Sequence, residues 1–142
     1  MPRASSAYSG TPLSTKLGLA EGMRLLLIGA PVEYARWIAP APAGLVMTSR
    51  STKPAAVHLF TTKRADLERQ LTRLRHALIE TGFVWVSWPK KAAKVPTDVT
   101  EDVIRAVALP MGFVDVKVCA VTDTWSALKL VVRVSERATG AR

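Results

Sequence analysis

The chain of 142 residues contains a single cysteine, Cys119, so no internal disulfide can form and a disulfide-built secreted fold is excluded. One cysteine and two widely spaced histidines give no zinc pattern, and we expect no metal site. The longest apolar run, from Leu25 to Val32, is far short of the ~20 residues that span a bilayer, so no membrane partner is expected. The segment Met1–Ser6 lacks the apolar region of a signal peptide, which favours a cytoplasmic protein.

Acidic residues are also few. Eleven Asp and Glu stand against twenty Lys and Arg, and the resulting net charge of +9 favours an anionic partner without naming one. Ten of the basic residues but only three acids lie between Arg50 and Lys94, so the positive charge belongs to the middle of the chain. Hydrophobic residues make up 49% of the chain, which is enough for the core of one ordinary globular domain.

Apolar runs alternate with helical patterns along the chain. They predict strands near 23–29, 44–48, 55–60, 83–88, 114–119 and 128–133, and helices near 11–18, 32–38, 63–80 and 98–109. The earlier strands are continuously apolar, which is typical of a parallel sheet covered on both faces, and the last two alternate as an antiparallel pair does. We expect one α/β domain over 11–134, with a mostly parallel sheet and flexible segments at 1–10 and 135–142.

The helix near 63–80 has the clearest pattern. Leucines recur on one of its faces, at positions 67, 71, 74 and 78, and charged residues lie on the other. This spacing predicts that Leu71 and Leu74 are core residues and that Arg73 is exposed. The helix that follows is expected to open with a capping pair formed by Asp98 and Glu101.

Four motifs resemble those of a family of small bacterial proteins known only as a domain of unknown function. They are YSGTPL at 8–13, GAP at 29–31, WVSWPKK at 85–91 and VPTD at 95–98. The resemblance runs over about residues 8–134. It implies a cytoplasmic bacterial protein and supplies no activity.

The order of elements from Met23 to Val134 is similar, more distantly, to the S-adenosylmethionine-dependent methyltransferase fold. A long leucine-rich helix leads through Gly82 into a strand, and an antiparallel strand pair closes the chain. The stretch from Ala39 to Ala55 is too short for every element of that fold. The resemblance therefore implies a trimmed, Rossmann-like domain of three layers.

The first strand-to-helix turn reads Gly29-Ala30-Pro31. Dinucleotide and S-adenosylmethionine sites use successive glycines here, so that backbone N–H groups can approach the ligand. Pro31 and Tyr34 stand where the dinucleotide pattern has its second and third glycines, and proline removes an N–H donor. No acid follows the second strand to hold a ribose. We therefore expect no cofactor and no tight binding of S-adenosylmethionine, and interpret the segment as a tight turn before a helix.

The loop over 89–97 carries three lysines and follows the carboxyl end of a central strand, where open α/β sheets place ligands. Its ammonium groups can hold a phosphate or a nucleic-acid backbone, and nearby tryptophans can stack on a base. The alternative is that the lysines are solvated and the tryptophans are core residues. The predicted ligand-binding residues are Gly29, Ala30, Pro31, Ser87, Trp88, Lys90, Lys91, Lys94, Thr97 and Trp125.

No catalytic set is legible, whether a Ser–His–Asp order, paired carboxylates or a glycine loop for phosphate. His58 lies between apolar neighbours in a strand and is expected to be a hydrogen-bonded core residue. We interpret the chain first as a non-catalytic α/β domain that binds a nucleotide, a phosphate metabolite or nucleic acid through the lysine loop. The alternatives are a reduced methyltransferase-like enzyme with an altered cofactor turn, and a subunit that docks another protein.

Overall fold

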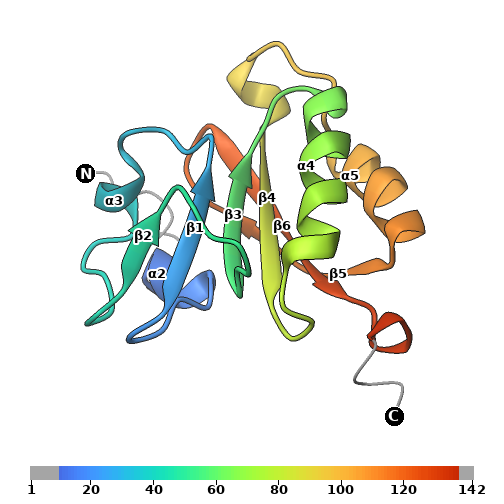
Figure 1. Ribbon diagram of the computed structural model, residues 1–142. Helices are drawn as coiled ribbons and strands as arrows, with labels where there is room; N and C mark the ends of the chain where they lie inside the picture. Colours follow the sequence, from blue (N-terminus) through green and yellow to red (C-terminus); the bar gives the residue numbers. More distant parts are fainter. Residues whose placement is uncertain (1–9, 138–142) are drawn as a thin grey trace.

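A six-stranded sheet in the order β2-β1-β3-β4-β6-β5 forms the centre of the protein (Figure 1). The computed structural model describes residues 10–137. Its strands are β1 (Arg24–Ile28), β2 (Val46–Thr48), β3 (Ala56–Phe60), β4 (Phe83–Pro89), β5 (Phe113–Ala120) and β6 (Trp125–Val132). The first four are parallel, and β6 pairs antiparallel with both β4 and β5. The α/β class, the mostly parallel sheet and the antiparallel pair at one end are confirmed.

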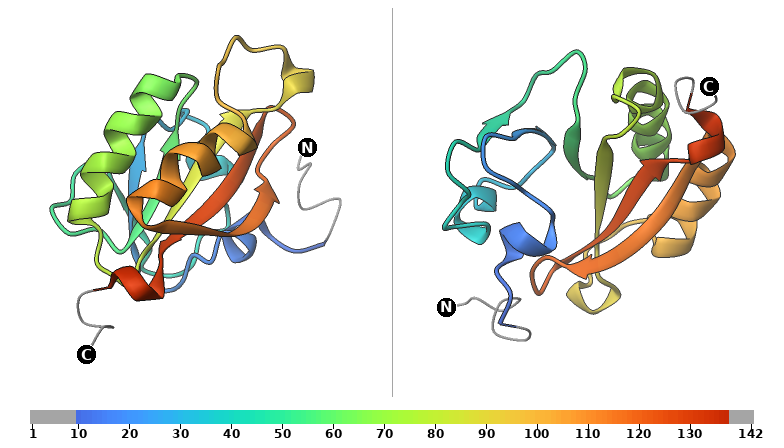
Figure 2. Two further views of the ribbon diagram at one scale, coloured as in Figure 1. Left: turned by 90° about the vertical axis from the view of Figure 1, so that its right-hand side faces the viewer. Right: turned by 90° about the horizontal axis from the view of Figure 1, so that it is seen from below.

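Helices cover both faces of the sheet, as the turned views show (Figure 2). On one face lie α4 (Arg64–Ala77) and α5 (Glu101–Ala108), and on the other lie the short helices α2 (Leu13–Lys16) and α3 (Tyr34–Trp37). The alternation of side chains along each strand serves both layers: Leu26 packs in the α4 and α5 core, and its neighbour Leu25 packs in the α2 and α3 core. This explains why the strand sequences are apolar without interruption.

Helix α4 has the predicted phase. Leu67, Leu71 and Leu74 are fully buried, and Arg73 is exposed. The helix ends at Ala77, earlier than predicted, because Leu78 is already extended. The N–H of Ile79 then bonds to Pro54 O at 2.9 Å instead of continuing the helix.

The predicted capping pair of α5 is wrong. Helix α5 begins at Glu101 and is capped by Thr100, whose Oγ1 accepts a hydrogen bond from the N–H of Val103 at 3.2 Å. Asp98 caps α4 instead: its Oδ1 accepts from the N–H of Arg64 at 2.6 Å. This contact joins residues 34 positions apart, which no local pattern reveals.

The edge strand β5 departs from simple alternation. Its register with β6 shifts between Asp115 and Lys117, and the inserted residue, Val116, and Val118 are 53% and 50% exposed. Beyond β6, residues Val134–Glu136 form a 3-10 turn. Most of the two terminal segments expected to be flexible, 1–9 and 138–142, lies outside the described residues. No helix within residues 10–137 is long and apolar enough to cross a membrane.

Candidate functional site

An open crevice of about 450 Å³ lies at the carboxyl ends of β1 and β3. In the sheet β1 lies between β2 and β3. The strands that follow β1 in the chain are therefore added on opposite sides of it, β2 on one side and β3 on the other. Open α/β sheets form their ligand crevices at such a switch in strand order. The lining residues come from the ends of β1 and β3, the start of α4 and the start of β6: Gly29, Phe60, Thr61, Thr62, Lys63, Ala65, Asp66, Arg69 and Trp125.

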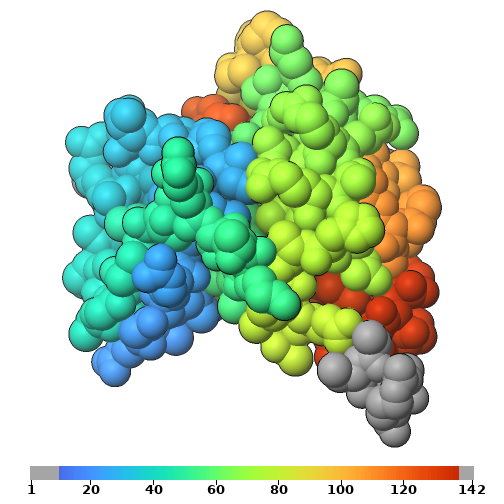
Figure 3. Space-filling model, viewed as in Figure 1, coloured from blue at the N-terminus to red at the C-terminus, as the bar shows by residue number. Residues whose placement is uncertain are grey.

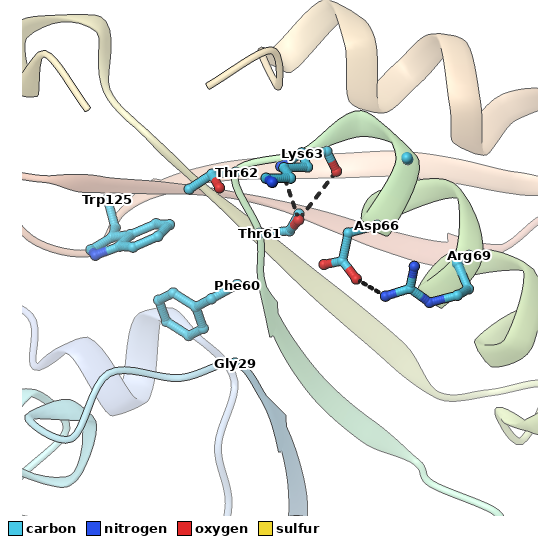
Figure 4. Close-up of a pocket in the computed structure, with 9 residues that line it drawn as sticks. Gly29, Phe60, Thr61, Thr62, Lys63, Asp66, Arg69 and Trp125 are labelled. Atoms are coloured by element: carbon cyan, nitrogen blue, oxygen red, sulfur yellow. Dashed lines mark hydrogen bonds and ion pairs between the residues drawn. The ribbon is translucent and has the colours of Figure 1, made fainter. Parts of the chain in front are cut away.

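One wall of the crevice is polar (Figure 4). Thr61 is buried and closes a turn. Its Oγ1 lies 3.3 Å from the backbone nitrogen of Lys63 and 3.3 Å from the backbone oxygen of the same residue. Asp66 pairs with Arg69 at 2.5 Å, and the arginine side chain is 69% exposed. Exposed pairs of this kind add little stability, so Arg69 can turn toward a ligand at small cost.

The opposite wall is aromatic. The ring of Phe60 meets that of Trp125 edge-on, with centroids 5.0 Å apart, and stacks on His58 at 4.4 Å. Phe60 is buried, whereas Trp125 is half-buried. Trp125 is therefore held in place and keeps part of its ring open to the crevice.

Beneath this wall, three buried side chains form a hydrogen-bonded chain. Tyr34 Oη lies 2.8 Å from His58 Nδ1, and His58 Nε2 lies 2.7 Å from Ser87 Oγ. Burial lowers the pKa of His58 to about 3 and raises the pKa of Tyr34, with a further contribution from Cys119. Both groups are therefore neutral at pH 7. Because His58 and Ser87 have no exposed surface, they fix the wall and cannot react with a substrate.

The lysine loop, residues 89–97, projects beyond the N-terminal end of α4 (Figure 3), and its residues are not among those that line the crevice. It contains a 3-10 turn over Lys91–Ala93, after which Lys94 has a left-handed φ of 57°. Near its start the loop is fixed on one side, where the N–H of Lys90 donates to Thr124 O at 2.7 Å. Its far end is fixed on the other side, where Thr97 Oγ1 donates to Thr62 O at 2.7 Å.

The structure brings together only part of the predicted site. Gly29 and Trp125 line the crevice, and Thr97 ties the lysine loop to its rim. Trp88 lies in the core against α4 and α5, and is only 9% exposed, so it is not available to stack on a base. Ser87 is engaged with His58, which is the hydrogen-bonded core residue expected. Ala30 and Pro31 are half-buried beside the crevice and are not among its lining residues.

Sequence reasoning missed the β3–α4 side of the crevice, from Phe60 to Lys63, together with Asp66 and Arg69. A signal for it was present. β3 is a parallel strand in the same sheet as β1, so both must end at the same edge. The segment that follows β3 was therefore as good a candidate for ligand binding as the Gly29 turn.

No family model matches the chain, so the resemblance to the small bacterial family stays a prediction. No curated protein sequence is similar to it. Solved structures, in contrast, share its fold. A putative type 11 methyltransferase from Sulfolobus solfataricus is 12% identical over 87% of this chain and 91% of its own, with a TM-score of 0.58. Magnesium protoporphyrin IX methyltransferase from Synechocystis PCC 6803, solved with bound S-adenosylmethionine, is 11% identical over 85% and 74%, with a TM-score of 0.57.

A third structure is a pre-rRNA processing fibrillarin from Methanococcus jannaschii, 10% identical over 78% of this chain, with a TM-score of 0.52. This chain covers 66% of that protein, slightly less than two thirds of its length. The fold is that of the Rossmann-like methyltransferases. At these identities the likeness shows the fold alone.

The expectation of no cofactor is wrong on this comparison. Structures of this fold include S-adenosylmethionine-dependent methyltransferases, some with the cofactor bound. The expectation rested on the Gly29 turn and on the absence of an acid after the second strand. It left out the β3–α4 side of the crevice, which sequence reasoning had not identified.

The residues of the crevice fit an adenosyl ligand, although the turn after β1 contributes little. A Cβ on Gly29 would lie 2.7 Å from Phe60 O, so this glycine makes room for the neighbouring strand. After β2, Thr48 Oγ1 closes onto the backbone of Arg50 and no acid is present. The β3–α4 side instead offers the hydroxyl of Thr62, a carboxylate and a guanidinium, and the open part of Trp125 offers a ring face. These groups match the polar, charged and aromatic parts of S-adenosylmethionine.

Proposed function

We propose that this chain is a reduced methyltransferase-like protein that binds S-adenosylmethionine in the crevice between β1 and β3. The observation that carries the proposal is the position of the crevice, at the switch point of a sheet with the methyltransferase fold. S-adenosylmethionine supplies a methyl group activated on a positively charged sulfur. The role of the protein is to hold that group and an acceptor in line and to exclude water.

Four of the lining residues have roles that follow from their chemistry. The rings of Trp125 and Phe60 attract a nearby positive charge, which the sulfonium carries. Arg69, which is exposed, can exchange its half-buried partner Asp66 for the ligand carboxylate. Asp66, once released, can accept hydrogen bonds from an ammonium or from ribose hydroxyls.

The non-catalytic reading, binding of an anion through the lysine loop, is the second candidate. The observation that favours it is the fixed conformation of the loop and the absence of ion pairs at Lys90, Lys91 and Lys94 among residues 10–137. The methyltransferase-like reading ranks first because it accounts for the crevice and the fold together.

Calorimetry with S-adenosylmethionine and S-adenosylhomocysteine tests the proposal. We expect both to bind, with the sulfonium compound tighter because the aromatic wall favours its charge. Arg69→Ala should weaken binding of both by about tenfold. Arg73→Ala, one turn further along the same exposed face, is the matched control and should leave both affinities unchanged. No binding of either compound at ~1 mM, about −4 kcal/mol, would overturn the proposal.

A further inference from the structure

The lysine loop is fixed to both walls of the crevice. On the aromatic side its anchor is Thr124, the neighbour of Trp125 in the chain. On the polar side two hydrogen bonds converge on Thr62 O, from Thr97 Oγ1 at 2.7 Å and from the N–H of Asp98 at 3.3 Å. The loop therefore has a set position relative to the crevice.

The charges of the loop face solvent. Lys91 and Lys94 are exposed and Lys90 is half-buried, and none of the three is in an ion pair within the described part of the chain. The nearest acid in sequence, Asp98, is engaged at the N-terminus of α4. Two more cations, Lys63 and Arg69, line the crevice beyond Thr62, and among residues 10–137 Arg69 is in an ion pair and Lys63 is not. The rim of the crevice therefore carries excess positive charge.

We propose that single-stranded nucleic acid is the acceptor for this crevice, with one base on Trp125 and the adjoining phosphates on Lys90, Lys91 and Lys94. The inference rests on the proposed function, since it names what would receive the methyl group. A half-buried ring, next in the chain to the residue that anchors a loop with three lysines, supplies the combination of aromatic surface and positive charge by which proteins hold single strands.

The shape of the site selects a single strand over a duplex. Trp125 is half-buried, lines the crevice and has its ring against that of Phe60. A base must leave its stack to contact that ring, which is easiest in a strand that is already unpaired. Lysines are flexible point charges without a planar fork, so they track phosphates without reading sequence.

Fluorescence anisotropy with a labelled single-stranded oligonucleotide, at several salt concentrations, tests the proposal. For the wild type we expect a log–log salt slope of about −2, from three lysine contacts at about −0.7 each. The triple variant Lys90→Ala, Lys91→Ala, Lys94→Ala should lose most of this slope and most of the affinity. Its melting temperature should stay almost unchanged, because exposed loop charges add little to folding.

A second triple variant with the same change in net charge is the matched control. Arg24, Arg50 and Lys53 are exposed and are likewise in no ion pair within residues 10–137. Replacing these three by Ala should leave oligonucleotide binding near the wild-type level. Equal losses from the two triple variants would mean that net charge alone attracts the strand, and equal binding by all three proteins would mean that the loop does not contact it. Either result overturns the proposal.

The contribution of the base is measured with inorganic polyphosphate and with the variant Trp125→Leu. We expect polyphosphate to bind severalfold more weakly than the oligonucleotide, and Trp125→Leu to lower oligonucleotide affinity severalfold while leaving polyphosphate binding unchanged. Because the two ligands are compared on one protein, a change in stability cannot produce this difference. Polyphosphate binding as tight as the oligonucleotide would overturn the base contact. All these measurements omit S-adenosylmethionine, so their failure is distinct from failure of cofactor binding.

Discussion

His58 Nε2 lies 2.7 Å from Ser87 Oγ, a contact between two side chains that have no exposed surface. Burial lowers the pKa of this histidine from 6.5 to about 3. In the unfolded chain the ring is protonated below its ordinary pKa, whereas in the folded chain it stays neutral down to about pH 3. Between these values the unfolded state binds more protons, so the stabilising effect is complete above pH 6.5 and is lost as the pH falls toward 3.

We therefore predict that the free energy of unfolding decreases as the pH is lowered from 6.5 toward 3. His58 should contribute up to about 1.4 kcal/mol of this decrease per pH unit. Urea unfolding at intervals from pH 7 to pH 4 measures it. His58→Gln should flatten the dependence, and His76→Gln, at an exposed position on α4, should leave it unaltered. An unchanged slope in His58→Gln would show that other groups cause the loss.

The two faces of α4 predict opposite outcomes for neighbouring substitutions. Leu71 is fully buried between α4 and the sheet, so Leu71→Ala should cost about 2–5 kcal/mol of unfolding free energy. Arg73 is exposed, and its side chain bonds to that of Gln70 one turn away, so Arg73→Ala should stay within about 0.5 kcal/mol of the wild type. Denaturant midpoints in the reverse order would contradict the packing of this helix.

Elements whose signal is local were predictable from the sequence. The leucine spacing of α4 set which face is buried, and the continuous apolar runs of β1, β3 and β4 indicated strands covered on both sides. The alternation in β6 indicated an antiparallel partner. The wrong predictions occur where a contact between residues far apart in the sequence overrides the local pattern. Asp98 has the right spacing to cap α5, yet it caps α4, because the lysine loop folds back onto the end of β3.

The site was harder to predict for the same reason. Its walls come from the ends of strands far apart in the chain, and Trp125 reaches Phe60 only because β6 lies beside β4. A tryptophan near the lysines was expected to stack on a ligand, but Trp88 and Trp125 cannot be told apart by composition. Only the register of β4 places Trp88 on the side covered by α4 and α5.

Asp98 links the lysine loop to the first turn of α4, and its removal should affect both. Its carboxylate satisfies the N–H of Arg64, one of the donors that a helix start leaves unpaired. Asp98→Ala should lower the free energy of unfolding by about 1 kcal/mol, and Asp98→Asn, which keeps an acceptor, by less. Hydrogen exchange should show faster exchange at Arg64 in the Ala variant. Equal stability of Asp98→Ala and the wild type would mean that the cap adds nothing in solution.

Gly29 and Gly22 form a matched pair for the last prediction, because both have a positive φ, at 69° and 73°. A Cβ at Gly22 would meet nothing within 4 Å, so Gly22→Ala should cost only the conformational penalty of about 1–2 kcal/mol. A Cβ at Gly29 would lie 2.7 Å from Phe60 O, in the backbone of the adjacent strand. Gly29→Ala should therefore cost about 1–3 kcal/mol more, as overpacked positions do. Because the clash pushes on the residue that forms the aromatic wall, this variant should also weaken S-adenosylmethionine binding while Gly22→Ala does not. Thermal unfolding and calorimetry of the two variants measure both effects, and equal behaviour of the pair would show that β1 and β3 do not approach this closely at the crevice.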